Sequence, residues 1–157
     1  MSELEGVLDG RGLRVAVIAA RFNAHITDVL LERCVAALHE YGCDPDEVEV
    51  IRVPGAWELP QMAARLANGR NWHAIIALGC VIRGDTPHFD FVAGEASRGL
   101  GQVAAQGHVP VIFGVLTTEN EAQARERAEP APHGQDKGRE AALAALEMAR
   151  RFSEFAP

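Results

Sequence analysis

The chain has 157 residues, of which 48% are hydrophobic and 24% charged, and its formal net charge is −7. This length suits one domain with a core large enough to fold without disulfides or metals, so we expect a single domain over residues 1–157. The acidic balance argues against nucleic acid or an anionic membrane as a general partner, and any anionic ligand needs a local group of basic side chains.

The first half of the chain carries two strand patterns, each followed by a helix pattern. Residues 13–19 predict a strand, and apolar side chains at helical spacing from Ile26 to Tyr41 predict a helix. Gly42 suits the end of that helix. A second strand is expected at residues 48–53 and a second helix at residues 59–66.

The second half of the chain repeats this alternation. A buried strand is expected at residues 73–78, with Gly79 at its end, and a helix follows from about Phe91. The last strand and the last two helices are expected at residues 109–116, 122–128 and 138–155. Alternating strands and helices predict an α/β fold with a four-stranded parallel sheet and helices on both faces.

The segment 79–90 is the most informative for function. Gly84 permits a sharp turn, Thr86 suits the N-cap of a helix, and Pro87 suits the first helical position. A helix start of this kind presents free N–H groups that attract an anion. His88 follows at once, and an imidazole exchanges protons near neutrality because its ordinary pKa is about 6.5. The pattern predicts a phosphate pocket beside a proton-transferring group, although His88 also fits a solvated helix start.

Several candidate residues follow the ends of the predicted strands. In a parallel sheet, ligands bind outside the carboxyl ends of the strands, so Phe22, Trp57 and residues 80–88 should converge. Two aromatic rings can hold a flat heterocycle, and Glu58 can accept hydrogen bonds from it. The aromatics also fit contacts to the next helix, and Glu58 fits a first-turn carboxylate. The basic side chains considered for the anion are Arg21, Arg83, Arg127 and Lys137.

The cysteines and histidines do not suggest a metal or a disulfide framework. Cys34, Cys43 and Cys80 are scattered and odd in number, and the six histidines include no ligand pair at metal-binding spacing. No apolar run approaches the roughly 20 residues that cross a bilayer, and the N-terminus lacks the apolar stretch of a secretory signal. We therefore expect a cytoplasmic protein without a metal.

Linked motifs from about residue 13 to residue 148 carry a resemblance to a known family. The motifs are RFN at 21–23, VPGAWELP at 53–60, ALGCVIRGDT at 77–86, HFD at 88–90, GVLTT at 114–118, and KG followed by EAA at 137–142. In these motifs the chain resembles the 6,7-dimethyl-8-ribityllumazine synthases, which catalyse the penultimate step of riboflavin synthesis.

The resemblance implies a flavodoxin-like three-layer α/β/α sandwich, assembled as pentamers, with the segment before Leu13 pairing with a neighbour's sheet. The implied reaction condenses 5-amino-6-ribitylaminouracil with 3,4-dihydroxy-2-butanone 4-phosphate to give the lumazine, phosphate and water, without a cofactor. A low-turnover paralogue of the same fold that binds a flavin or lumazine is the alternative. A flavodoxin-type electron carrier fits less well, because residues 19–22 are not a Ser/Thr/Gly-rich phosphate loop.

The resemblance also implies roles for individual residues. The residues implied for the pyrimidine substrate are Phe22, Asn23, Ala56, Trp57, Glu58, Cys80, Val81, Ile82, Phe113 and Lys137. Those implied for the phosphate substrate are Gly84, Asp85, Thr86 and Arg127. His88 and Arg127 are the implied catalytic residues, and Arg127 and Phe113 would reach in from the neighbouring subunit.

The chain departs from the family pattern at three places. Trp57 is bulkier than the phenylalanine often found there, and Pro87 replaces a residue with an N–H. The segment between Arg127 and Lys137 is longer and richer in proline than in members that form icosahedral shells. Because prolines stiffen and redirect a connection, we expect a free pentamer or a pair of pentamers.

Overall fold

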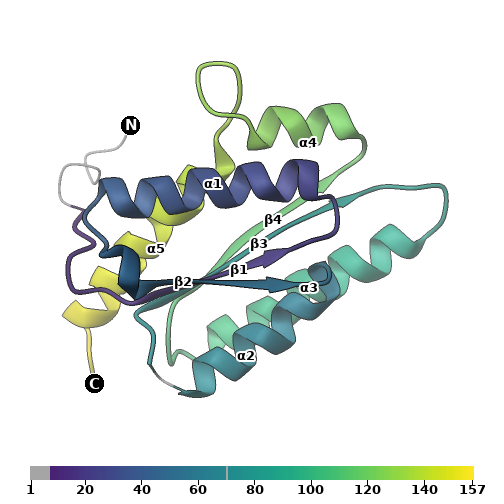
Figure 1. The fold of residues 1–157 in the computed structure, drawn as a ribbon. Helices are drawn as coiled ribbons and strands as arrows, with labels where there is room; N and C mark the ends of the chain where they lie inside the picture. The colour runs from purple at the N-terminus through teal and green to yellow at the C-terminus, as the bar shows by residue number, and fades with distance from the viewer. Residues whose placement is uncertain (1–7, 70) are drawn as a thin grey trace.

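The computed structural model describes residues 8–69 and 71–157, and Figure 1 shows their fold. The strands are β1 (Val15–Ala20), β2 (Val48–Val53), β3 (Ala74–Ile82) and β4 (Val111–Thr118). The helices are α1 (Ala24–Glu40), α2 (Leu59–Gly69), α3 (His88–Ala105), α4 (Glu121–Ala128) and α5 (Lys137–Glu154). Two 3₁₀ turns, η2 (Pro45–Glu47) and η3 (Ala56–Glu58), flank β2.

The four strands form one parallel sheet in the order β2-β1-β3-β4. The chain steps from β1 to β2 on one side and then crosses β1 to place β3 and β4 on the other. The strand order therefore reverses between β1 and β3, and the carboxyl ends of the strands meet at one edge of the sheet (Figure 1). This order confirms the expected parallel sheet and matches the flavodoxin-like arrangement, where ligands bind at such a reversal.

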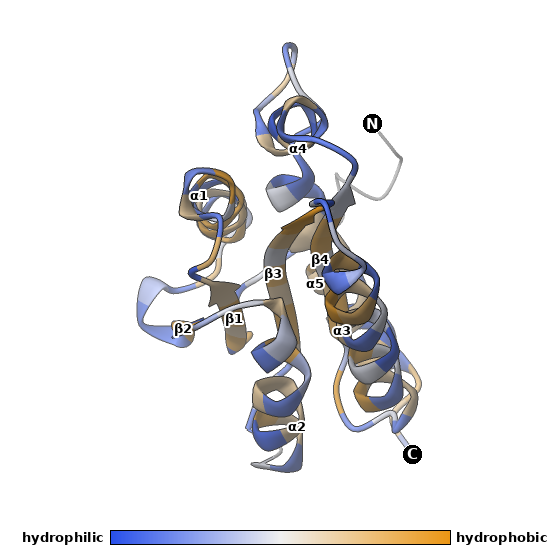
Figure 2. Ribbon diagram, turned by 90° about the vertical axis from the view of Figure 1, so that its right-hand side faces the viewer, coloured by the Kyte–Doolittle hydropathy of each residue, from blue (hydrophilic) through white to orange (hydrophobic). Residues whose placement is uncertain are grey.

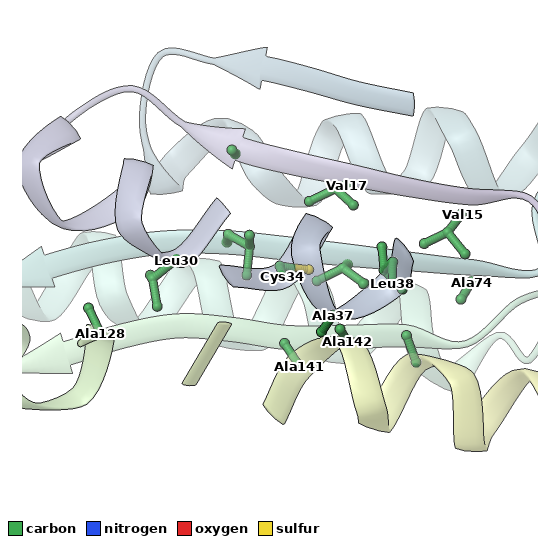
Figure 3. Close-up of a cluster of buried hydrophobic side chains, with 14 of the residues drawn as sticks. Val15, Val17, Leu30, Cys34, Ala37, Leu38, Ala74, Ala128, Ala141 and Ala142 are labelled. Atoms are coloured by element: carbon green, nitrogen blue, oxygen red, sulfur yellow. The ribbon is translucent and has the colours of Figure 1, made fainter. Parts of the chain in front are cut away.

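Helices cover both faces of the sheet, which confirms the three-layer arrangement. Side chains alternate along β1, with Val15 and Val17 facing α1, α4 and α5, whereas Ala16 and Ile18 face α2 and α3. Figure 3 shows part of the core between the sheet and helices α1, α4 and α5. Figure 2 shows the apolar centre of the sheet between helices with polar outer faces. All six residues of β1 are buried, as expected for a central parallel strand.

The third strand runs four residues beyond its expected end. We expected it to stop at Leu78 because Gly79 looked like a boundary, but β4 pairs with β3 as far as Ile82. Gly79 instead serves close packing, since a Cβ atom there would lie 3.2 Å from Leu59 Cδ1. Cys80, Val81 and Ile82 therefore belong to the strand and not to the following loop.

Helix α3 begins at His88, three residues before the apolar pattern that marks it at Phe91 and one residue after the start that Thr86 and Pro87 suggested. Pro87 occupies the N-cap, and its carbonyl accepts the backbone N–H of Asp90 at 2.9 Å, so Pro87 is not the first helical residue and Thr86 is not the N-cap. The Thr86 hydroxyl still accepts the His88 N–H, at 3.4 Å. Phe91 marks this helix as expected, but its side chain is 71% exposed and faces away from the core.

Three other features bear on the expectations from sequence. None of the helices among the described residues has the length and apolar character to span a bilayer. Most of the segment before Leu13, which was expected to pair with a neighbour, lies outside the described residues. The Pro-rich link after α4 folds back on that helix, because the Gln135 N–H donates to the Glu126 carbonyl and the Asp136 N–H donates to the Glu129 carbonyl.

Candidate active site

The carboxyl ends of β1, β2 and β3 surround a hollow of about 580 Å³, which we call the strand-end hollow. Its described lining residues are Phe22, Pro54, Gly55, Ala56, Trp57, Glu58, Cys80, Val81, Ile82, Gly84, Thr86, His88, Phe89, Phe91 and Val92. They come from the end of β3, from η3 and the loops after three strands, and from the start of α3, so the sheet's topology brings them together.

Two exposed aromatic side chains stand at the mouth of the strand-end hollow. Phe22 is 71% exposed and Trp57 is 52% exposed, although both rings are large and apolar. A Cβ atom at Gly55 would lie at ordinary contact distance from both side chains, 3.9 Å from Phe22 Cβ and 3.5 Å from Glu58 Oε1, so Gly55 lies between Phe22 and Glu58. Exposed aromatic surface beside a carboxylate suits a flat, hydrogen-bonding ligand.

Asn23 holds this end of the sheet together. Its backbone is in the left-handed region with φ of 61°, and its side-chain amide donates to the Cys80 carbonyl at 2.9 Å. Its own carbonyl accepts the N–H groups of Ile26 and Thr27. Asn23 was expected to contact the substrate. In the structure, its hydrogen bonds fix the start of α1 against β3.

The thiol of Cys80 is a poor nucleophile. Burial raises its pKa to about 11, with a smaller contribution from the carboxylate of Glu121. All three cysteines are free and buried, and burial likewise raises the pKa of Cys34 to about 12. Covalent catalysis by thiolate is therefore disfavoured at neutral pH.

A second hollow of about 340 Å³ lies along β4, which is an edge strand, and we call it the β4-edge hollow. Its described lining residues are Ile112, Phe113, Gly114, Val115, Leu116, Thr117, Arg127, Lys137, Glu140, Ala141 and Ala144. Side chains from β4, α4 and α5 therefore meet here, and none of these described residues also lines the strand-end hollow.

The β4-edge hollow carries cations. The Arg127 guanidinium donates through Nη1 to the Gln123 carbonyl at 3.1 Å, and Lys137 Nζ lies 3.1 Å from Glu140 Oε2. Phe113 adds a ring that is 48% exposed. Glu140 was not among the residues expected from sequence, yet its place three residues after Lys137 on the same helix is a signal that could have found it.

Lys137 is positioned by the start of α5. Asp136, whose φ is 52°, receives two hydrogen bonds from the Arg33 guanidinium, at 3.0 Å and 2.7 Å, and its side chain is only 9% exposed. A Cβ atom at Gly138 would overlap the backbone of Leu30, so α5 approaches α1 closely here. These contacts bind the first turn of α5 to α1 and fix where Lys137 emerges.

The expected site residues thus divide between two surfaces of the protomer. Ten of them line the strand-end hollow: Phe22, Ala56, Trp57, Glu58, Cys80, Val81, Ile82, Gly84, Thr86 and His88. Three line the β4-edge hollow: Phe113, Arg127 and Lys137. Asn23 and Asp85 line neither, and Asp85 lies exposed in the turn before α3. Across the described residues, no three His, Cys, Asp or Glu side chains are grouped so as to hold a metal ion.

The sheet order places this protein in the class of flavodoxin-like α/β proteins, and the strand-end hollow lies at the strand-order reversal, where proteins of this class bind ligands. Fold alone does not fix the chemistry. The sequence model of the 6,7-dimethyl-8-ribityllumazine synthase family matches residues 12–153, and the chain belongs to that family.

Individual relatives agree with the family match. A 6,7-dimethyl-8-ribityllumazine synthase from Nitratidesulfovibrio vulgaris strain Miyazaki F is 49% identical over 152 residues, which cover 97% of this chain and 96% of the relative. Relatives of the same name from strains DP4 and Hildenborough of that species are each 48% identical with the same coverage. The similarity thus extends over nearly the whole of both chains.

Proposed function

We infer that this chain is a lumazine synthase of riboflavin biosynthesis. It condenses 5-amino-6-ribitylaminouracil with 3,4-dihydroxy-2-butanone 4-phosphate and releases 6,7-dimethyl-8-ribityllumazine, phosphate and water. Membership of the family and similarity over 97% of the chain support this reaction. The strand-end hollow suits the flat pyrimidine, because exposed rings and a carboxylate stand at its mouth.

We propose that the complete active site forms between two protomers. The strand-end hollow of one protomer supplies aromatic rings and His88, and the β4-edge hollow of its neighbour supplies Phe113, Arg127 and Lys137. The observation that carries this proposal is the separation of Phe22, Trp57 and His88 from the cations, in two hollows without a shared lining residue among the described ones. A phosphorylated ketone and a flat amine need both sets of groups in one place.

Each set of groups has a chemical task in this proposal. Phe22 and Trp57 hold the pyrimidine ring, so that its amine stays close to the ketone carbonyl, and this proximity supplies much of the rate. The Arg127 guanidinium grips the phosphate, since its planar fork matches two phosphate oxygens. His88 moves protons as the imine forms, phosphate leaves and the second ring closes.

We propose that the assembly is a pentamer or a pair of pentamers. The link between α4 and α5 folds back on α4 and is held to α1 through Asp136. Its course is therefore fixed, and it shapes this edge of the subunit. Strand β2 is an edge of the sheet with Glu49 and Val50 exposed, so it offers backbone groups to a neighbour's N-terminal segment. Sedimentation that shows a hollow particle of megadalton mass would contradict this assembly.

We place the enzyme in the cytoplasm. Three free, buried thiols in an odd number suit a reducing compartment. Cell fractionation with an antibody against the protein tests this, and recovery in an oxidising compartment would contradict it.

The activity is tested by mixing the purified protein with both substrates and following the absorbance and fluorescence of the lumazine. We expect turnover that needs both substrates and releases phosphate in step with the lumazine. Tight binding of the lumazine without turnover would instead support a carrier of flavins or lumazines.

A further inference from the structure

Arg83 stands beside the strand-end hollow, at the point where β3 ends and the turn of residues 84–87 begins. It lies next to Gly84 but is not one of the described residues that line the hollow. Its backbone N–H donates to the Thr118 carbonyl at 2.8 Å, which is the last bond between the ends of β3 and β4. Its side chain is 40% exposed.

The Arg83 side chain spans the turn and contacts the first residues of α3. The guanidinium carbon lies 4.5 Å from the centre of the Phe89 ring, and Nη1 lies 3.4 Å from Asp90 Oδ1. Phe89 itself packs against the core under α2 and α3. The two ends of the turn are therefore joined by one side chain, with His88 directly beside the residues that it contacts.

Arg83 also reaches the segment that starts α4. Its Nε donates to Glu119 Oε2 at 2.8 Å, and Glu119 precedes Asn120, whose side chain caps α4 through the Gln123 N–H. The two carboxylates raise the pKa of the guanidinium, so it stays fully charged. Nε and Nη1 of Arg83 thus face carboxylates, and one face of its guanidinium lies over a ring inside the protomer.

We propose that Arg83 is a positioning residue for the phosphate substrate: it ties the turn of residues 84–87 to Phe89, Asp90 and Glu119 and thereby sets the N–H groups and the Thr86 hydroxyl for the phosphate. This inference rests on the proposed function and adds a residue to it. Arg83 acts through the turn, and its charge remains directed to the two carboxylates while the phosphate binds.

The alternative role for an arginine at this place is direct contact with phosphate, and the two roles differ in the sign of one effect. If Arg83 has to leave Glu119 to bind phosphate, removal of the Glu119 charge frees the guanidinium and tightens phosphate binding. If Arg83 holds the turn through Glu119, removal of that charge loosens the turn and weakens phosphate binding.

The experiment measures steady-state kinetics of the assembled protein with both substrates, together with inhibition by inorganic phosphate. For Arg83→Ala we expect KM for the phosphate substrate and Ki for inorganic phosphate to rise together by about threefold to tenfold, because exposed ion pairs contribute modestly. KM for the pyrimidine should change by less than about twofold, since Phe22 and Trp57 are untouched.

Glu119→Gln and Asp90→Asn complete the test, because they remove charge with little change of shape. We expect both to raise KM and Ki in the same direction as Arg83→Ala, by a smaller factor. They also keep the inference testable if Arg83→Ala fails to assemble. Arg98→Ala is the matched control, since Arg98 forms an exposed pair with Glu95 on the same helix at 2.6 Å, and it should leave both constants unchanged.

Two outcomes would overturn the inference and leave the proposed function intact: lumazine formation with unchanged phosphate constants in Arg83→Ala, or tighter phosphate inhibition in Glu119→Gln. Equal rises of KM for both substrates would also overturn it, since they would indicate a general loss of structure. Absence of lumazine formation by the parent protein would instead contradict the proposed function.

Discussion

The strand-end hollow and the β4-edge hollow differ in the chemistry that their side chains offer. The first has exposed rings from Phe22 and Trp57 with the imidazole of His88, and the second has the cations Arg127 and Lys137 with the ring of Phe113. The first is built where parallel strands end, and the second lies along an edge strand. Neither hollow alone has all the groups that are needed to bind both a phosphorylated ketone and a flat amine.

This division predicts that substitutions of different groups change different kinetic constants. Loss of the imidazole should affect proton transfer, loss of the rings should affect the pyrimidine, and loss of Arg127 or of the turn of residues 84–87 should affect the phosphate. Kinetics that separate turnover from half-saturation can therefore assign a task to each side chain.

The largest expected effect is on proton transfer. His88→Ala should lower kcat by roughly tenfold to a thousandfold with small changes in both KM values, because general acid–base catalysis contributes in this range and solvent substitutes in part. His108→Ala is the control, since His108 lines a different hollow at the far end of the sheet. An unchanged kcat in His88→Ala would remove this imidazole from the mechanism.

Arg127→Ala should raise KM for the phosphate substrate by about a hundredfold, because a bidentate contact with phosphate is lost. KM for the pyrimidine should change much less. Arg125→Ala is the control, since Arg125 is on the same helix and pairs with Glu121 at 3.6 Å. A rise in KM for the pyrimidine alone would show that Arg127 does not serve the phosphate.

A smaller effect is expected where α5 begins. Asp136→Ala should lower the free energy of unfolding by about 2 kcal/mol, because it leaves Arg33 without its partner and places alanine at a left-handed backbone position. Asp136→Asn should cost about half as much, since asparagine tolerates that backbone. Urea unfolding at one protomer concentration measures both, and equal, negligible changes would contradict the structural role of this pair.

The smallest effect concerns the thiol in the strand-end hollow. Because burial raises the pKa of Cys80 to about 11, only a small fraction is thiolate at pH 8, and alkylation by iodoacetamide should be slow. Its rate should rise about tenfold for each pH unit between pH 8 and pH 10. Mass spectrometry of the Cys80 peptide measures this rate, and a plateau below pH 9 would show that the pKa is not raised.

The sequence predicted the sheet well because the signal for buried parallel strands is local. The apolar run at 13–19 and the motif at 53–60 placed β1 and the turn after β2 within a few residues. The prediction for the end of β3 was wrong, because a glycine after an apolar run is typical of a strand end. The close packing of Leu59 against Gly79 is not visible in the sequence.

Ten residues that were expected at the site line the strand-end hollow, and three others line the β4-edge hollow. Phe22, Trp57 and His88 follow strand ends, so topology alone places them together. The position of Arg127 depends on the direction of α4, and the partner of Arg83 lies 36 residues away at Glu119, so neither can be read from local sequence. Glu140 was overlooked because an acidic residue three positions after a lysine is common on helix surfaces.

The most direct test of the shared site is complementation between two variants that are each nearly inactive when the phosphate substrate is near the parent's KM. Equal amounts of His88→Ala and Arg127→Ala protein are unfolded, mixed and reassembled, and lumazine formation is assayed with saturating pyrimidine and with the phosphate substrate near the parent's KM. If each site takes His88 from one protomer and Arg127 from its neighbour, random mixing restores both side chains at about a quarter of the sites, and activity should approach that fraction of the parent's. Activity no greater than that of the two variants reassembled separately would contradict a site shared between protomers.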